Sequence, residues 1–235
     1  MPLQSSPAIC AQPAIAGCSL WTVELDVLPA QDALAILADD ELARMNRFHF
    51  ERDRRRFASG RAALRWLLGS VLDRDPASLR FSTGAHGKPS LGDDPQLAFN
   101  LSHSGASAII AIDPARRHRA VGVDLELRRE VPDALALAQS CFDDGEQQAL
   151  AACSGVVRDE AFLRGWTRKE ACLKAAGTGF SSDLIPTTGI DAAARRVRLH
   201  DGSSAWLGSL QIPHAVAALA VVERGGPHGG GAAAS

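Results

Sequence analysis

Apolar and polar residues alternate along several short segments of the chain, which is the pattern of β-strands that bury one face. Residues 121–126, VGVDLE, follow this pattern. Two valines and a leucine fall on one face of such a strand, whereas Asp124 and Glu126 share the other face with a glycine. Like charges on one strand face repel each other, so this strand requires something that relieves the repulsion.

The remaining elements follow from the same alternation and from helical periodicity. Further strands are predicted near residues 19–27, 97–101, 106–112, 195–200, 204–212 and 215–222. Helices are predicted near residues 31–46, 53–72, 132–140, 143–153 and 157–176. Residues 81–96 are expected to form a loop, 1–18 a loose leader and 224–235 a flexible tail. Because strands and helices do not alternate regularly, the predicted fold class is α+β.

The composition is that of a globular protein. The 235 residues are 46% hydrophobic and 22% charged, and the formal net charge of −2 gives no whole-chain attraction to nucleic acid or to an anionic membrane. No apolar run is long enough to span a membrane, and the N-terminus does not resemble a signal peptide. The five cysteines form no CxxC pair, which favours reduced thiols and a cytoplasmic location over a zinc site or a disulfide framework.

Arginine dominates the basic residues. Only three of the 25 Lys and Arg residues are lysine, and eight arginines fall between Arg44 and Arg65. Such a cluster is either the solvated face of a helix or an anion site, since the guanidinium fork suits phosphate. By itself the cluster favours the solvated face.

Two motifs carry candidate acids. Asp124 and Glu126 would lie about 6–7 Å apart along their strand, and an Arg, a shared proton or a divalent cation could relieve their repulsion. Alone, such a pair is more often a strand end that reaches solvent. In WTRKEACLK, residues 166–174, Trp166, Glu170 and Lys174 share one helical face. Glu170 and Lys174 form either a surface pair or a buried set with a function.

Two further motifs carry candidate donors. In FNLSHSG, residues 99–105, Ser102 and His103 suggest a nucleophile and a base, but no matching acid is evident, so a hydrolase is disfavoured. Asn100 and these two residues could instead donate to an anionic ligand, or cap their own backbone. Lys88 lies in a turn, HGKPS, between a glycine and a proline. Three carboxylates together with several cations favour a metal-dependent phosphoryl reaction on a polyanion, without identifying the substrate.

At these motifs the chain resembles the 4′-phosphopantetheinyl transferases of the long single-chain, surfactin-type (Sfp-type) group. The family patterns G-[IV]-D-x-E and W-x-x-K-E-[AS]-x-x-K correspond to GVDLE and WTRKEACLK. The family's upstream elements correspond to GKP and FNLSHSG, and all four occur in the family's order. The resemblance covers roughly residues 44–180 and implies transfer of the phosphopantetheine arm of coenzyme A to a serine of an apo carrier protein, which releases adenosine 3′,5′-bisphosphate.

The resemblance also implies residue roles. Asp124, Glu126 and Glu170 look like ligands of Mg²⁺, with Mn²⁺ as the alternative ion, and Glu170 is also the candidate general base for the serine. Lys174 looks like the residue that steadies the coenzyme A diphosphate. The expected coenzyme A contacts are Lys88, Asn100, Ser102, His103, Arg56, Lys174 and, by a loose alignment, Arg44.

The fold implied by the resemblance consists of two similar α+β halves around a pseudo-twofold axis, with the active site in the cleft between them. We expect the halves to cover residues 19–113 and 114–223 of a monomer. The partner would be an apo acyl or peptidyl carrier protein, docked near the helix after Glu126, around Arg128 and Phe142. The pathway that uses the carrier, whether fatty acid, polyketide or non-ribosomal peptide synthesis, is left open. A Mg²⁺-dependent hydrolase of a diphosphate and a non-catalytic binding module are the competing hypotheses.

Overall fold

The first of two four-stranded sheets is built from both ends of the N-terminal part of the chain. The computed structural model describes residues 8–28, 30–84, 87–179 and 185–223. The strands of this sheet lie in the order β1-β2-β6-β5, and all neighbours are antiparallel. Their bounds are β1 Ile9–Ile15, β2 Cys18–Glu24, β5 Phe99–Ser104 and β6 Ser107–Ile112.

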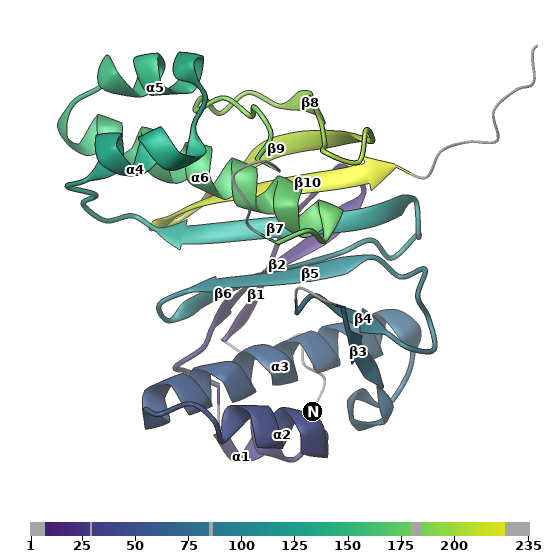
Figure 1. The fold of residues 1–235 in the computed structure, drawn as a ribbon. Coiled ribbons are helices and arrows are strands. Elements are labelled where there is room, and N and C mark those ends of the chain that lie inside the picture. The colour runs from purple at the N-terminus through teal and green to yellow at the C-terminus, as the bar shows by residue number, and fades with distance from the viewer. Residues whose placement is uncertain (1–7, 29, 85–86, 180–184, 224–235) are drawn as a thin grey trace, which may run out of the picture.

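The second sheet is built from the C-terminal part of the chain. Its strands lie in the order β7-β10-β9-β8, again with antiparallel neighbours. Their bounds are β7 His118–Leu127, β8 Arg195–Arg198, β9 Ser204–Ile212 and β10 Ala215–Glu223. The two sheets lie against each other in the middle of the molecule, with helices on both outer sides (Figure 1).

Within the described ranges, six α-helices lie on the outer sides of the sheets. Helices α1 Ala30–Leu34, α2 Asp39–Met45 and α3 Glu51–Leu72 lie on the side of the first sheet. Helices α4 Ala134–Cys141, α5 Asp144–Ala151 and α6 Gly155–Ala176 lie on the side of the second, with α3 and α6 against the strands and the short helices packed on these two. The first half also contains a 3-10 turn at Pro76–Ser78 and a small hairpin of β3 Phe81–Thr83 and β4 Pro89–Leu91. In the part of the chain that the structure describes, no helix is long and apolar enough to cross a membrane.

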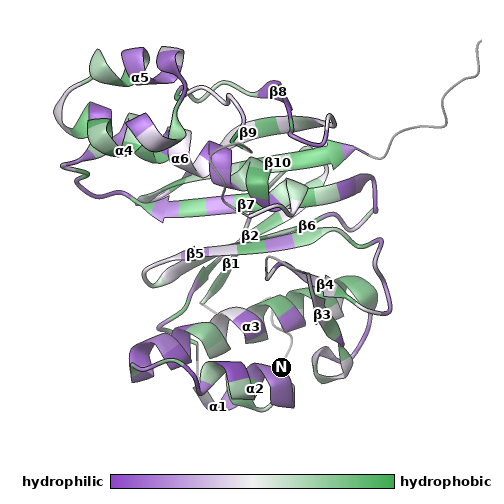
Figure 2. Ribbon diagram, in the orientation of Figure 1, coloured by the Kyte–Doolittle hydropathy of each residue, from purple (hydrophilic) through white to green (hydrophobic). Residues whose placement is uncertain are grey.

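Alternation along the strands explains this layering. Ile109 and Ala111 of β6 pack against Val121 and Val123 of β7 in a core between the two sheets, whereas Ile110, the intervening residue of β6, packs toward α3. Each face of β6 is therefore buried, against a different layer. Figure 2 shows hydrophobic residues concentrated on the strands, with β10 the most continuous example.

The two parts of the chain repeat one plan, which confirms the predicted α+β fold with two sheet-containing halves. Each has a first strand, short helices, a helix of 22 residues and a final antiparallel pair. In each sheet the last strand lies between the strand that precedes the short helices and the penultimate strand, as β2-β6-β5 and as β7-β10-β9, and the first sheet adds β1 beyond β2. The expected boundary between residues 113 and 114 stays a prediction.

Three predictions of local structure were wrong. Residues 9–15 of the expected leader form β1, an edge strand whose pairing with β2 is irregular between Gln12 and Ile15, and an edge strand tolerates a proline at such a point. The helix expected over 31–46 is divided into α1 and α2, because the acidic run from Asp39 begins a new helix. The loop expected over 81–96 contains β3 and β4. The predicted tail, residues 224–235, lies outside the described residues.

Candidate active site

A cavity of about 440 Å³ brings together most of the residues that the sequence suggested for the site. Its walls come from α2 and α3 of the first half, from β5, and from β7 and α6 of the second half. The lining includes Arg44, Arg56, Ser102, His103, Asp124, Glu126, Glu170 and Lys174. Two expected residues, Lys88 and Asn100, line an adjoining cavity of about 250 Å³ that shares Glu170 and Lys174 with the first. The structure thus gathers residues that lie up to 130 positions apart in the sequence.

Asp124 is the most buried carboxylate of the cavity, with 4% of its surface exposed. Its Oδ1 atom accepts a hydrogen bond from Ser102 Oγ at 2.7 Å and lies 2.5 Å from Lys174 Nζ. Lys174 Nζ also donates to Ser102 Oγ at 2.9 Å. The second oxygen, Oδ2, is buried and has no hydrogen-bond partner among the described residues. Asp124 therefore presents one oxygen whose capacity is unused, which is costly unless something binds there.

The other two carboxylates are less buried. Glu126 Oε2 accepts a hydrogen bond from Ser104 Oγ at 2.8 Å. The pKa of Glu170 is raised, chiefly by burial and next by the negative charge of Asp124, while Lys174 acts in the opposite direction. The repulsion inferred from the sequence is thus relieved by a lysine ammonium at Asp124 and by serine hydroxyls at both strand residues.

Side chains of β5 form hydrogen bonds to β7 and so connect the two sheets beside the cavity. Asn100 Oδ1 accepts the backbone N–H of Val123 at 2.9 Å, and Ser104 Oγ accepts that of Leu127 at 3.3 Å. Every second residue of β5 therefore contacts β7, although the two strands belong to different sheets. The amide oxygen of Asn100 therefore connects the two sheets. The contact of Asn100 with coenzyme A stays a prediction.

Ser104 is the residue of this set that sequence reasoning missed. Its position two residues after Ser102 in FNLSHSG was the available signal, because both serines then lie on one strand face.

Lys88 reaches across to the second half through its ammonium group. Nζ donates to the carbonyl oxygens of Lys174 at 2.6 Å and of Val121 at 2.9 Å. The first of these carbonyls belongs to the last turn of α6, where a cation is favoured. Burial lowers the pKa of Lys88 to about 8. Its ammonium thus closes the end of the helix that carries Glu170 and Lys174.

The sequence left open whether the arginine cluster is a solvated helix face or an anion site, and the structure divides its members between the cavity and the fold. Arg56 lines the cavity and pairs with both oxygens of Asp26, at 2.8 and 2.7 Å. Arg44 also lines the cavity, with its guanidinium 5.5 Å from the ring centre of Phe57. Arg65, by contrast, is 1% exposed and pairs with Glu41. Some arginines therefore face the cavity, whereas others support the fold.

Gly122 makes room for α6. A Cβ atom at this position would lie 2.1 Å from the Ala171 carbonyl oxygen and 2.3 Å from the Ala175 nitrogen, which are backbone atoms of that helix. Only glycine allows so close an approach. The glycine beside the two carboxylates thus serves the contact between α6 and β7, which brings Glu170 and Lys174 close to Asp124.

The donor chemistry fits a hard divalent cation, although the ligand set is not assembled. Asp124, Glu126 and Glu170 offer carboxylate oxygens to one cavity, and the unpartnered Asp124 Oδ2 is such a donor. Across the described ranges, no group of three or more His, Cys, Asp or Glu side chains is close enough to hold a metal ion. Lys174 and the two serines engage the carboxylates instead, and the ammonium occupies the Oδ1 side of Asp124 only, which leaves Oδ2 open to an ion.

The surface expected to receive a carrier protein is only partly accessible. Phe142 is 5% exposed and packs against Gly165 of α6, so its ring offers little surface to a partner, and its part in docking stays a prediction. Arg128 is exposed, and its Nε lies 3.6 Å from Glu160 Oε2.

Comparison with known proteins supports one family over both halves. Residues 120–222 match a family model described as the 4′-phosphopantetheinyl transferase superfamily, and residues 26–115 match one described as 4′-phosphopantetheinyl transferase, N-terminal. The 4′-phosphopantetheinyl transferase HetI of a Nostoc species is 41% identical over 167 residues, which cover 69% of each chain. The 4′-phosphopantetheinyl transferase Sfp of Bacillus subtilis is 29% identical over 64% of this chain and 65% of its own. The human L-aminoadipate-semialdehyde dehydrogenase-phosphopantetheinyl transferase is 28% identical over 65% of this chain and 52% of its own.

Proposed function

The chain belongs to the 4′-phosphopantetheinyl transferase superfamily and is a transferase enzyme; from that premise we propose that it transfers the 4′-phosphopantetheine arm of coenzyme A to a serine hydroxyl of an apo acyl or peptidyl carrier protein. The observation that carries this proposal is the shared cavity, where three carboxylates and several cations from both halves meet. A phosphate binder alone would gain nothing from three carboxylates, whereas an enzyme that handles a diphosphate with a metal ion needs both kinds of group.

The proposed reaction divides the roles among these side chains. The serine oxygen attacks the phosphorus that bears the pantetheine arm, and the bond from that phosphorus to the oxygen of the neighbouring phosphate breaks. Glu170 takes the serine proton, a role that its raised pKa supports because it makes the carboxylate a better base. Lys174 offsets the negative charge on the leaving adenosine 3′,5′-bisphosphate.

The remaining residues of the cavity bind and orient the substrate in this proposal. Asp124, Glu126 and Glu170 would hold Mg²⁺, or Mn²⁺ in its place, and the bound ion supplies positive charge that offsets the coenzyme A diphosphate. Arg44, Arg56 and His103 line the same cavity and would contact phosphate groups of coenzyme A. Ser102 and Lys88 hold Asp124 and the end of α6, respectively, and so support the acidic groups, while their predicted contacts with coenzyme A stay part of the proposal.

The proposal is tested by following adenosine 3′,5′-bisphosphate release by chromatography, with and without apo carrier protein. We expect release that needs both the carrier and a divalent cation and that stops when EDTA is added. Release at the same rate without any carrier would replace transfer by hydrolysis of coenzyme A. Binding of coenzyme A without release under any condition would indicate a binding module.

A further inference from the structure

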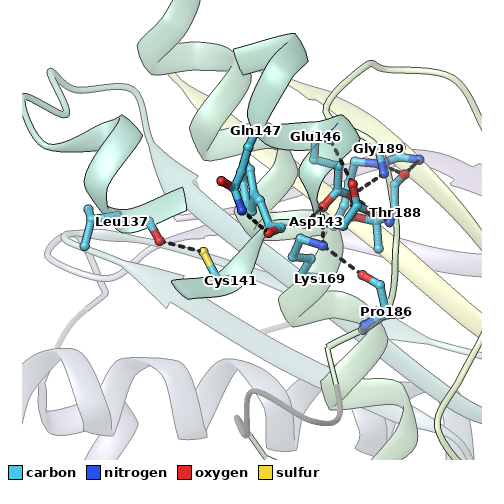
Figure 3. Close-up of polar contacts among 11 residues, drawn as sticks. Leu137, Cys141, Asp143, Glu146, Gln147, Lys169, Pro186, Thr188 and Gly189 are labelled. Carbon is cyan, nitrogen blue, oxygen red and sulfur yellow. Dashed lines mark hydrogen bonds and ion pairs between the residues drawn. The ribbon is translucent and has the colours of Figure 1, made fainter. Parts of the chain in front are cut away.

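A buried ion pair holds α6 from outside the cavity, on a flank of the helix about 100° around its axis from Glu170. Lys169 Nζ lies 2.6 Å from Glu146 Oε2 of α5 and donates to the Pro186 carbonyl oxygen at 2.8 Å. The two charged side chains are 1% and 4% exposed. Figure 3 shows Lys169, Glu146 and the chain around residues 186–189 converging at this point. Two buried charges are tolerated only where their other hydrogen-bonding atoms are satisfied as well.

The carboxylate of Glu146 is fully used. Oε1 accepts the N–H groups of Thr188 at 2.9 Å and of Gly189 at 2.7 Å, and Oε2 accepts that of Asp143 at 3.1 Å. Asp143 in turn caps the start of α5 by accepting the N–H of Glu146. One carboxylate thus joins three segments, which are the start of α5, the middle of α6 and the chain that follows α6.

The first half of the molecule contains a matching pair. Glu41 and Glu146 are each the third residue of a short helix, α2 and α5. Their partners Arg65 and Lys169 are each the fifteenth residue of a 22-residue helix, α3 and α6. Arg65 Nε lies 2.7 Å from Glu41 Oε2, and Arg61 Nε, one turn earlier on α3, donates to Oε1 of the same carboxylate at 2.7 Å. The same brace between a short and a long helix is therefore present in both halves.

The two braces differ in the residue that follows the cation. Trp66 follows Arg65, whereas Glu170 follows Lys169 and lines the cavity. Consecutive helical residues point about 100° apart around the axis. A rotation of α6 that separated Lys169 from Glu146 would therefore also turn Glu170 away from its place at the cavity wall.

We propose that Glu146 and Lys169 are positioning residues for the transfer reaction, because their ion pair fixes the rotation of α6 and so the place of Glu170. This inference rests on the proposed function and adds two residues that act on Glu170 from outside the cavity. Gly122 fixes how closely α6 approaches β7, and the ion pair fixes which residues of α6 face the cavity.

The test compares Lys169→Met with Arg65→Met, which removes the matching cation from the brace of the first half. Lys169→Met leaves the buried Glu146 without this cation, and Arg65→Met leaves the buried Glu41 with Arg61 alone, so both variants should melt at lower temperature than the wild type. Arm transfer is measured well below both melting temperatures. We expect kcat of Lys169→Met to fall about 10- to 100-fold, with KM for coenzyme A within about threefold, since misplacing a reacting group costs this much. For Arg65→Met we expect kcat within about twofold of the wild type.

Two further variants separate positioning from stability. Lys169→Arg keeps the cation, and Arg occupies the matching place in the first half, so kcat should stay within about threefold of the wild type. Glu146→Gln with Lys169→Met removes both charges, so the melting temperature should recover relative to Lys169→Met, while kcat should stay low. If Lys169→Met does not fold, Glu146→Gln alone takes its place in the comparison.

The outcomes distinguish this inference from the function on which it rests. Three outcomes would show that the pair only stabilises the fold. The first is a folded Lys169→Met with wild-type kcat, and the second is an equal loss of kcat in Arg65→Met. The third is recovery of kcat together with the melting temperature in the double variant. In all three cases the wild type still transfers the arm, and the proposed function stands. A wild type that transfers no arm overturns both.

Discussion

At the scale of single residues, the centre of the site is the contact between Lys174 and Asp124. The lysine ammonium lies 2.5 Å from Oδ1 of a carboxylate that is also a candidate metal ligand. A metal ion at the open Oδ2 atom would lie close to this ammonium at Oδ1, and like charges repel, so the two cations compete for Asp124. The coenzyme A diphosphate is an alternative partner for Lys174 in the proposed reaction, which would couple binding of the metal to binding of the substrate.

Replacing Lys174 with Met should therefore strengthen metal binding while it weakens catalysis. We expect Lys174→Met to bind Mn²⁺ several-fold more tightly than the wild type in the absence of coenzyme A, because the competing ammonium is gone. Free Mn²⁺ is measured by electron paramagnetic resonance. Arg44→Met is the matched control, since it removes a cation that lines the cavity without a hydrogen bond to Asp124 in the structure. Unchanged or weaker binding in Lys174→Met would contradict the competition.

Lys88 offers a second residue-scale prediction, through the pH dependence of stability. Burial lowers its pKa to about 8 in the folded protein, below the ordinary lysine value of about 10.4 in the unfolded chain. Between these values the unfolded chain binds more protons, so the contribution of Lys88 to stability rises with pH. The free energy of unfolding of the wild type, relative to Lys88→Met, should increase from pH 8 to pH 10 in urea titrations. A flat or falling difference would mean that this ammonium is not buried as the structure shows.

At the scale of elements, helix α6 provides three of the side chains that line the cavity. Its Trp166, Glu170 and Lys174 line the cavity, as their spacing of four residues predicted. On a neighbouring side of the helix Lys169 pairs with Glu146, and the helix backbone contacts β7 at Gly122. A helix held on two sides in this way presents its carboxylate with little freedom.

The close contact between α6 and β7 can be tested through Gly122. Gly122→Ala should lower the free energy of unfolding by about 1–3 kcal/mol, which is the usual cost of overpacking a core, because the new methyl group meets backbone atoms of α6 that cannot rotate away. Gly145→Ala in α5 is the control, because its Cβ would have no neighbour closer than 3.4 Å, and alanine should be neutral or stabilising there. Urea titration of both variants makes the comparison, and equal stability of Gly122→Ala and the wild type would refute the contact.

At the scale of the whole molecule, the sequence predicted the elements well and their mutual contacts poorly. The period of apolar residues located α3, α6 and the strands of the second sheet within a few residues. It could not reveal β1, since a strand at a sheet edge can contain a proline that normally argues against a strand. The division of residues 31–46 into two helices was also hidden, because α2 continues the apolar pattern of α1.

The site shows the same limit. Motifs located the residues that line the cavity, because each motif contains polar groups whose burial needs a reason. Contacts between motifs were not predictable, since they depend on how β5 and α6 lie against β7. These unpredicted contacts include the ion pair of Lys174 with Asp124, the hydrogen bonds of the serines along β7 and the ion pair at Glu146.

The central claim is tested most directly by the intact mass of an apo carrier protein after incubation with this protein, coenzyme A and MgCl₂. A panel of acyl and peptidyl carriers is used, each beside a form in which the modified serine is alanine. We predict that at least one carrier gains the mass of a single phosphopantetheine arm, that its alanine form gains none, and that Asp124→Ala and Glu170→Ala abolish the gain. No gain on any carrier, or full activity in Asp124→Ala, would contradict the account.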